Sequence, residues 1–123
     1  MIDVSLSQSF LNPKSVAIIG ASADPKKTGS RAQRFLVSHG YKGKIFPVNP
    51  NREEIFGLKC YPNLKSINEQ VDYIFIAVDG NKIFEAIRDA VSKKVRCATI
   101  LSGGFSESGS KGNVLEKHIF KIA

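Results

Sequence analysis

A short apolar run that ends in a turn of small residues constrains the fold of this chain more than any other feature. Residues 15–19 read Ser-Val-Ala-Ile-Ile, which is typical of a strand buried on both faces. Gly20, Ala21 and Ser22 follow, and a segment with helical spacing begins at Gly29. Such a strand, turn and helix N-terminus form the first βα unit of a nucleotide-binding sheet, because the unpaired N–H groups of a helix N-terminus attract phosphate.

This turn departs from the dinucleotide fingerprint G-x-G-x-x-G. Ser22 stands where the second glycine belongs, and the loop continues through residues 24–27. An NAD-binding sheet also carries an acidic residue at the end of its second strand, where it holds a ribose hydroxyl. The second apolar run, residues 44–48, is followed instead by Asn49 and Pro50. The pattern therefore favours the fold and disfavours NAD.

The composition indicates one domain and is compatible with an anionic partner. A length of 123 residues suits a single domain, and the formal net charge is +7. A phosphorylated cofactor fits this charge, whereas the scattered basic residues disfavour nucleic acid. For the net charge taken alone, a basic surface that only maintains solubility, or that meets an acidic partner, is the favoured explanation. Apolar runs too short for a bilayer and the lack of a signal peptide make a cytoplasmic protein the default expectation, with no membrane partner.

Strands and helices alternate along the chain, which predicts an α/β fold with a Rossmann-like, doubly wound parallel sheet in three layers, α/β/α. The most apolar run, residues 73–78, is expected to be the central strand. The other strands are expected at 15–19, 44–48 and 97–101. Helices are expected at 29–38, 82–93 and 111–122, with one helical turn at 62–67.

Some details of these elements are also predicted. Ala32, Phe35 and Leu36 are expected to face the sheet from the first helix. Asp79 is expected to lie in the loop that caps the following helix. Residues 55–61 are expected to be irregular or to form a short edge strand.

Four strand exits are expected at one edge of the sheet, at residues 20–22, 48–52, 78–80 and 102–105. Ligands of open α/β sheets bind outside the carboxyl ends of the strands, so this edge is the predicted binding site. Turns of Gly, Ser, Asn and Pro are also what short βα loops use for structural reasons alone. The small side chains at all four exits favour a ligand.

The chain resembles the CoA-binding domain that opens the NDP-forming acyl-CoA synthetases (acetate–CoA ligase, ADP-forming), with the succinyl-CoA synthetase α subunit as a relative. The resemblance extends over residues 10–112 and consists of motifs in family order. The matching segments are residues 10–22, 43–50, 54–57, 61–64, 71–73, 76–78 and 102–107. One departure lies at Asp79, where the family often has proline.

The resemblance implies that the ADP part of coenzyme A crosses the strand exits, with its phosphates near Gly20. Arg52 holds the position of a basic phosphate contact, and a guanidinium can bind phosphate through two hydrogen bonds. Ser102 and Gly103 are expected to approach the pantetheine arm. The candidate cofactor-binding residues are Gly20, Ala21, Ser22, Val48, Asn49, Pro50, Arg52, Ala77, Val78, Ser102 and Gly103. No catalytic or metal-binding residue is expected.

The resemblance also implies partners beyond these 123 residues. In the family, a succinyl-CoA-ligase-like domain with a phosphohistidine and an ATP-grasp domain carry out acyl transfer, and ATP, ADP and Mg²⁺ belong to those domains. Residues 1–123 are therefore expected to form one CoA-binding domain, the N-terminal fragment of a longer chain and inactive alone. Two alternatives remain open, a stand-alone CoA- or nucleotide-sensing protein and an NAD(H)-binding redox domain.

Overall fold

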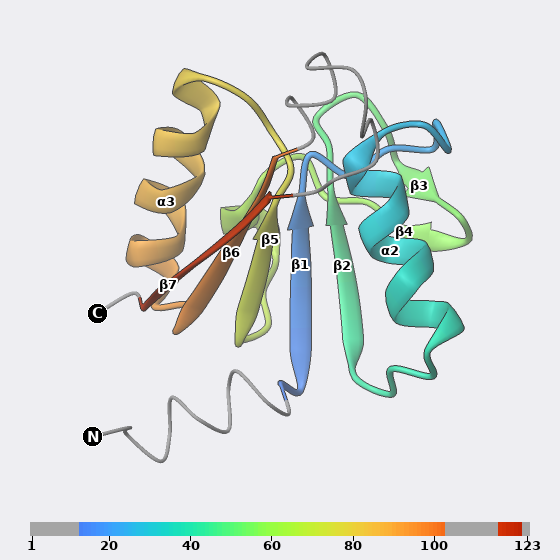
Figure 1. Ribbon diagram of the computed structural model, residues 1–123. Coiled ribbons are helices and arrows are strands. Elements are labelled where there is room, and N and C mark those ends of the chain that lie inside the picture. The colour runs from blue at the N-terminus through green and yellow to red at the C-terminus, as the bar shows by residue number, and fades with distance from the viewer. Residues whose placement is uncertain (1–12, 103–115, 122–123) are drawn as a thin grey trace.

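Five strands form the main sheet in the order β2-β1-β5-β6-β7 (Figure 1). This computed structural model describes residues 13–102 and 116–121. The first four strands are parallel, and β7 runs antiparallel to β6. As predicted, β5 is the central strand. The strand bounds are Ser15–Ile19 for β1, Lys44–Val48 for β2, Tyr73–Ile76 for β5, Cys97–Ser102 for β6 and Glu116–Lys121 for β7.

Helices cover the two faces of this sheet, which confirms the three-layer α/β/α prediction (Figure 1). Helix α2 (Thr28–Ser38) packs on one face through Ala32 and Leu36. Helix α3 (Asn81–Lys93) and the 3₁₀ turn η1 (Leu64–Ser66) pack on the other face. Beyond β2, the short strands β3 (Glu54–Ile55) and β4 (Leu58–Lys59) form an antiparallel hairpin.

The apolar run of β1 is buried on both faces because each face of the sheet has its own core. Ala17 belongs to the core under α3, whereas Ile18 belongs to the core under α2. Side chains alternate along a strand, so neighbouring residues serve opposite layers. Val16 and Ala17 are both almost fully buried. A continuous apolar run is therefore what this position in the sheet requires.

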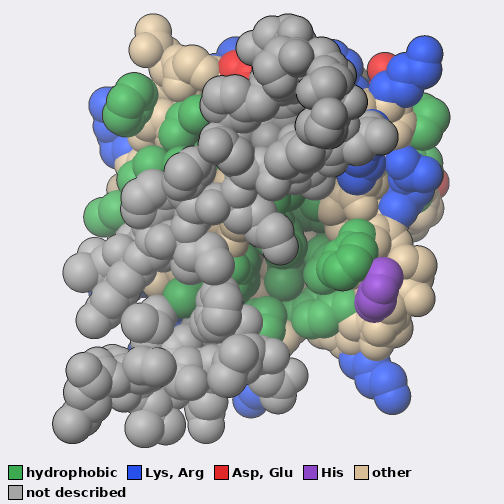
Figure 2. Space-filling view, in the orientation of Figure 1, with side chains coloured by type: hydrophobic (Ala, Val, Ile, Leu, Met, Phe, Trp, Pro, Cys, Tyr) green, Lys and Arg blue, Asp and Glu red, His purple; other side chains and the backbone are tan. Residues whose placement is uncertain are grey.

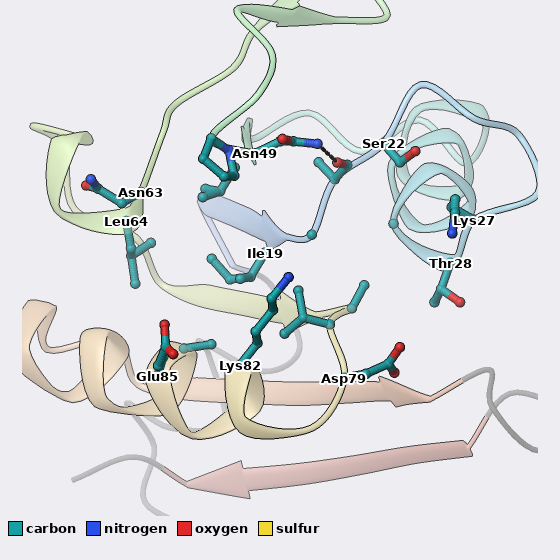
Figure 3. A pocket seen from close by; sticks show the side chains of 18 of the residues that line it. Ile19, Ser22, Lys27, Thr28, Asn49, Asn63, Leu64, Asp79, Lys82 and Glu85 are labelled. Atoms are coloured by element: carbon teal, nitrogen blue, oxygen red, sulfur yellow. Dashed lines mark hydrogen bonds between the residues drawn. The ribbon is translucent and has the colours of Figure 1, made fainter.

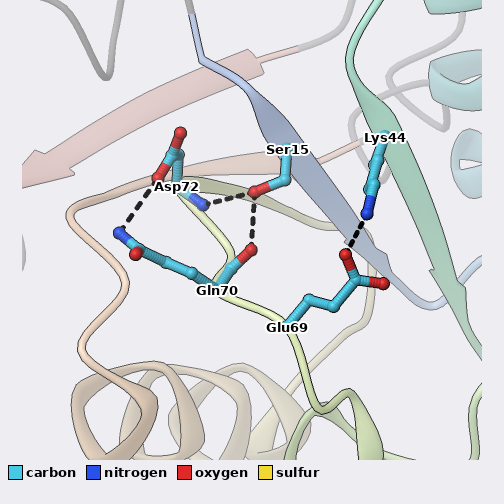
Figure 4. Close-up of polar contacts among 5 residues, drawn as sticks. All are labelled: Ser15, Lys44, Glu69, Gln70 and Asp72. Atoms are coloured by element: carbon cyan, nitrogen blue, oxygen red, sulfur yellow. Dashed lines mark hydrogen bonds and ion pairs between the residues drawn. The ribbon is translucent and has the colours of Figure 1, made fainter.

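A polar network fixes the amino-terminal end of the sheet, away from the strand exits (Figure 4). The Ser15 hydroxyl donates to the Gln70 carbonyl at 2.8 Å and accepts from the Asp72 N–H at 3.0 Å. An ion pair between Lys44 and Glu69 joins the same region to β2. Both charged side chains are well exposed, so this pair contributes little to stability. The Ser15 contacts hold the segment before β5 against β1.

Two glycines permit close packing around the end of β1. Gly20 has a φ of +89°, and a Cβ there would lie 2.5 Å from the Ala77 carbonyl oxygen. A Cβ on Gly29 would lie 2.1 Å from the Gly20 carbonyl oxygen. Neither position leaves space for a side chain, so Gly20 permits the close approach of the chain after β5, and Gly29 permits the close approach of α2 to the end of β1.

The helix expected at residues 111–122 is wrong, because residues 116–121 form strand β7. This strand pairs with β6, with His118 opposite Ile100 in the register. Pairing satisfies the backbone groups of β6 that would otherwise form an open sheet edge. Such a short segment, with apolar residues only at Ile119 and Phe120, fits a helix or a strand equally well by periodicity alone. The sheet is therefore parallel except for its last strand.

One smaller expectation, that Phe35 faces the sheet, is also corrected. Phe35 is 57% exposed and stacks on His39 at 4.0 Å between ring centroids, whereas Gln33 is the buried residue of that turn. Figure 2 shows an apolar patch beside the one histidine drawn in purple. The loop that contains Asp79 caps α3 as expected, because the N-cap residue is Gly80, and no side chain caps this helix. The buried side-chain amide of Gln33 donates to the Ile55 carbonyl at 3.1 Å, which ties α2 to the β3–β4 hairpin.

We expect Gly29→Ala to destabilise the fold by about 1–3 kcal/mol, because the added methyl overlaps the Gly20 carbonyl. Helix propensity alone would make the same change stabilising. Urea unfolding measures the difference, with the exposed helical change Ser92→Ala as the control for propensity. A Gly29→Ala variant at least as stable as the parent would contradict the close approach.

Candidate functional site

A cavity of about 740 Å³ lies at the carboxyl ends of the strands, between β1 and β5 (Figure 3). Strand β2, which follows β1 in the chain, lies on one side of β1, and β5 lies on the opposite side of β1, so the strand order reverses at β1. Ligands of doubly wound sheets bind at such a reversal of strand order. The sequence-predicted residues that line the cavity are Gly20, Ala21, Ser22, Val48, Asn49, Pro50, Ala77 and Val78.

The other predicted residues lie elsewhere. Arg52 is exposed and is not among the residues that line the cavity. Its backbone N–H donates to the Asn49 carbonyl at 3.4 Å, so its loop turns back toward β2. Ser102 is the last residue of β6, and Gly103 lies outside the described residues. The phosphate role of Arg52 and the pantetheine roles of Ser102 and Gly103 stay predictions.

The sequence analysis missed several charged residues of this cavity. Lys26 and Lys27 line it from the loop before α2, and Lys82 lines it from the first turn of α3. A signal for them was present, since the first turn of a helix that follows a strand exit lies at the same edge as that exit. Further lining residues are Thr28, Gly29, Asn63, Leu64, Asp79, Glu85 and Asp89.

The first two N–H groups after β1 are already engaged. The N–H groups of Gly20 and Ala21 both donate to the Val48 carbonyl, at 3.1 and 3.2 Å. Within the described residues, no acceptor takes the N–H of Ser22. The Ser22 hydroxyl accepts from the N–H of Asp24 at 3.0 Å, which turns the loop away. Ser22 is therefore the first residue of this turn whose backbone can bind an anion.

The N-terminal end of α2 supplies more donors to the cavity. Lys27 is the N-cap residue, and no side chain caps this helix. The first helical bond runs from the Arg31 N–H to the Lys27 carbonyl at 3.2 Å, so the N–H groups of Thr28 and Gly29 have no partner within the helix. The first turn carries no acidic residue to offset the positive end of the helix dipole. This helix end suits a phosphate.

Lysine side chains add net charge to that helix end. Lys26 and Lys27 are exposed, and Figure 3 places Lys27 beside Thr28 at one end of the cavity. Figure 2 shows Lys and Arg side chains at the upper right of the molecule, near the place where α2 begins in Figure 1. Partly solvated ammonium groups beside free N–H groups favour a ligand that carries phosphate.

Asn49 positions two loops of the cavity. Its side-chain amide donates to the Ala21 carbonyl at 2.8 Å (Figure 3). Its side-chain oxygen accepts from the Asn51 N–H at 2.8 Å. Both contacts lie within the protein, so the end of β2 is tied to the end of β1. Asn49 therefore shapes the cavity through other residues.

The two cysteines lie outside the cavity and are buried. Burial raises the pKa of the Cys60 thiol and of the Cys97 thiol above their ordinary values. Both are therefore protonated and weakly nucleophilic at neutral pH. Among the described residues, no group of His, Cys, Asp and Glu side chains could hold a metal ion. None of the helices in that part of the chain is long and apolar enough to cross a bilayer.

Unpaired N–H groups and basic side chains at the switch point of a doubly wound sheet are the arrangement by which domains of this class bind nucleotide phosphates. A family model described as a CoA binding domain matches residues 14–119. The chain belongs to this family of CoA-binding domains, as the sequence motifs predicted.

Known relatives agree with this assignment. The ADP-forming acetate–CoA ligase II of Archaeoglobus fulgidus is 43% identical over 90% of this chain and 16% of its own length. The α subunit of the corresponding Pyrococcus furiosus enzyme is 37% identical over 93% of this chain and 25% of its own length. The solved acetyl-coenzyme A synthetase 1 of Ca. Korarchaeum cryptofilum, in complex with phosphate and ADP, has a TM-score of 0.75 and 39% identity. It is matched over 85% of this chain and 22% of its own, so this chain corresponds to one domain of much longer relatives.

We expect Asn49→Ala to lower the free energy of unfolding by about 1–2 kcal/mol, because it removes two hydrogen bonds and leaves the Ala21 carbonyl without its donor. Urea unfolding measures this change. Asn51→Ala is the matched control, since it makes the same substitution in the same loop at an exposed side chain. Equal stabilities of the two variants would show that the Asn49 contacts do not hold the loops.

Proposed function

We propose that the cavity binds coenzyme A through its ADP part. The observation that carries this proposal is the uncapped start of α2, which opens into a cavity at the switch point of the sheet beside Lys26 and Lys27. The membership of the chain in the CoA-binding family supports the same cofactor.

The pyrophosphate of the cofactor is proposed to lie against the N–H groups of Ser22, Thr28 and Gly29. These are the donors that the folded chain leaves unpaired, and Lys27 adds charge beside them. The nucleoside is proposed to contact the apolar lining residues Val48, Pro50, Ala77 and Val78. Arg52 is proposed to reach a phosphate from the rim of the cavity, and Ser102 and Gly103 to lie toward the pantetheine arm.

The chain is further proposed to serve an NDP-forming acyl-CoA synthetase, which interconverts acyl-CoA, NDP and phosphate with the free acid, CoA and NTP. The similarity to ADP-forming acetate–CoA ligases supports this reaction. Acyl transfer and the handling of ATP, ADP and Mg²⁺ are assigned to succinyl-CoA-ligase-like and ATP-grasp domains or subunits. This domain contributes CoA binding in the cytoplasm and no catalytic group.

We expect the 123-residue chain to bind CoA and to bind NADH much more weakly, because the end of β2 offers Asn49 where an NAD site needs a carboxylate. Isothermal titration calorimetry with each ligand at low and high salt measures both affinities. Binding of CoA should weaken as salt rises, since its phosphates meet lysines. Tight NADH binding by a folded chain that ignores CoA would overturn the proposed function.

We expect Lys27→Gln to weaken CoA binding by about tenfold, because it removes one partly solvated ammonium contact to phosphate. Arg52→Ala should have a smaller effect, since Arg52 lies outside the lining of the cavity. Lys42→Gln removes the same charge from an exposed position outside the cavity and controls for net charge. A larger loss for Arg52→Ala than for Lys27→Gln would reverse the assignment of the main phosphate contact.

A further inference from the structure

Helix α3 contributes a wall of mixed charge to the cavity. Glu85 and Asp89 line it from the helix, and Asp79 lines it from the loop before the helix. Lys82 is the basic residue of this wall. Figure 3 shows the Lys82 side chain extending into the cavity, with Glu85 to one side and Asp79 to the other.

Lys82 has no ionic partner among the described residues. Glu85 is three residues further along the same helix, a spacing at which opposite charges commonly pair. The ion pair that the described part of the chain does contain joins Lys44 to Glu69, at the other end of the sheet. The Lys82 ammonium is therefore free to meet a ligand, although three carboxylates line the same wall.

The cavity thus has two separate sources of positive charge. One is the start of α2 with Lys26 and Lys27, and the other is Lys82 on α3. Figure 3 places Lys27 and Lys82 on different elements, on different sides of the cavity. A ligand with a single phosphate group needs one of them, whereas a ligand with two separated anionic groups can use both. Coenzyme A is of the second kind, because it has a pyrophosphate and a further phosphate on the ribose 3′ oxygen.

We propose that Lys82 binds the ribose 3′-phosphate and so makes the cavity select coenzyme A over dephospho-CoA. This inference rests on the proposed function of the cavity, and it adds that a residue of α3 recognises the 3′-phosphate of the cofactor. A phosphate elsewhere on that wall would meet Asp79, Glu85 or Asp89, so Lys82 is the position at which a second anion is favoured. The preference for CoA then follows because the carboxylates of the wall repel a phosphate everywhere except beside the Lys82 ammonium.

The test compares CoA with dephospho-CoA by calorimetry in the parent chain, Lys82→Gln and Lys82→Arg. Lys82 is exposed and its side chain makes no hydrogen bond within the described structure, so both variants should fold. We expect the parent to prefer CoA by about tenfold, the strength of one partly solvated contact to a charged phosphate. Lys82→Gln should abolish this preference and leave dephospho-CoA binding within about twofold, whereas Lys82→Arg should retain the preference.

Lys42→Gln is the charge-matched control and should keep the preference of the parent. Equal binding of CoA and dephospho-CoA by the parent would overturn the inference and leave the proposed function intact. A preference that survives Lys82→Gln would also overturn it. Equal losses for both ligands in Lys82→Gln would place Lys82 on the pyrophosphate instead. A folded parent that binds neither ligand would overturn the proposed function together with the inference.

Discussion

The close approach of α2 to the end of β1 is the constraint on which the site depends. A Cβ on Gly29 would lie 2.1 Å from the Gly20 carbonyl oxygen, so only glycine allows the helix to begin there. Because the helix begins at the strand exit, its unpaired N–H groups open into the cavity. The helix has no side-chain cap, because its N-cap residue is Lys27 and an ammonium group cannot accept a hydrogen bond. An anion can take the place that a cap would fill in another protein.

Hydrogen bonds within the protein decide which backbone groups remain for a ligand. The Val48 carbonyl accepts from both Gly20 and Ala21, and Asn49 joins the ends of β1 and β2. The turn is therefore rigid before a ligand arrives, which lowers the entropy lost on binding. The available donors begin at Ser22 and continue at the start of α2. Charge around this turn comes from lysines on two elements, and the carboxylates of α3 limit where an anion can lie.

Much of the fold and part of the site could be predicted from the residues. The apolar runs of β1, β2, β5 and β6 lie in strands because such runs need burial on both faces, and α2 and α3 follow the helical spacing. Residues 116–121 were misassigned because a short segment fits either structure until its partner is known. Phe35 was misassigned because periodicity gives the buried face of α2 only to within about one position. The pairing partner and the packing face are tertiary facts.

The sequence by itself determined the α/β class, the strand exits that form the cavity and the family of the chain, because these depend on local patterns and ordered motifs. Only the tertiary structure decided which groups at those exits are free. The Asn49 side chain is hydrogen-bonded to the backbone of Ala21 and Asn51. The N–H groups of Gly20 and Ala21 are hydrogen-bonded to the Val48 carbonyl. Arg52 is not among the residues that line the cavity. Lys82 enters the cavity from a helix that is far from β1 in sequence. Hydrogen-bond partners and side-chain direction depend on elements brought together by folding, and no local pattern records them.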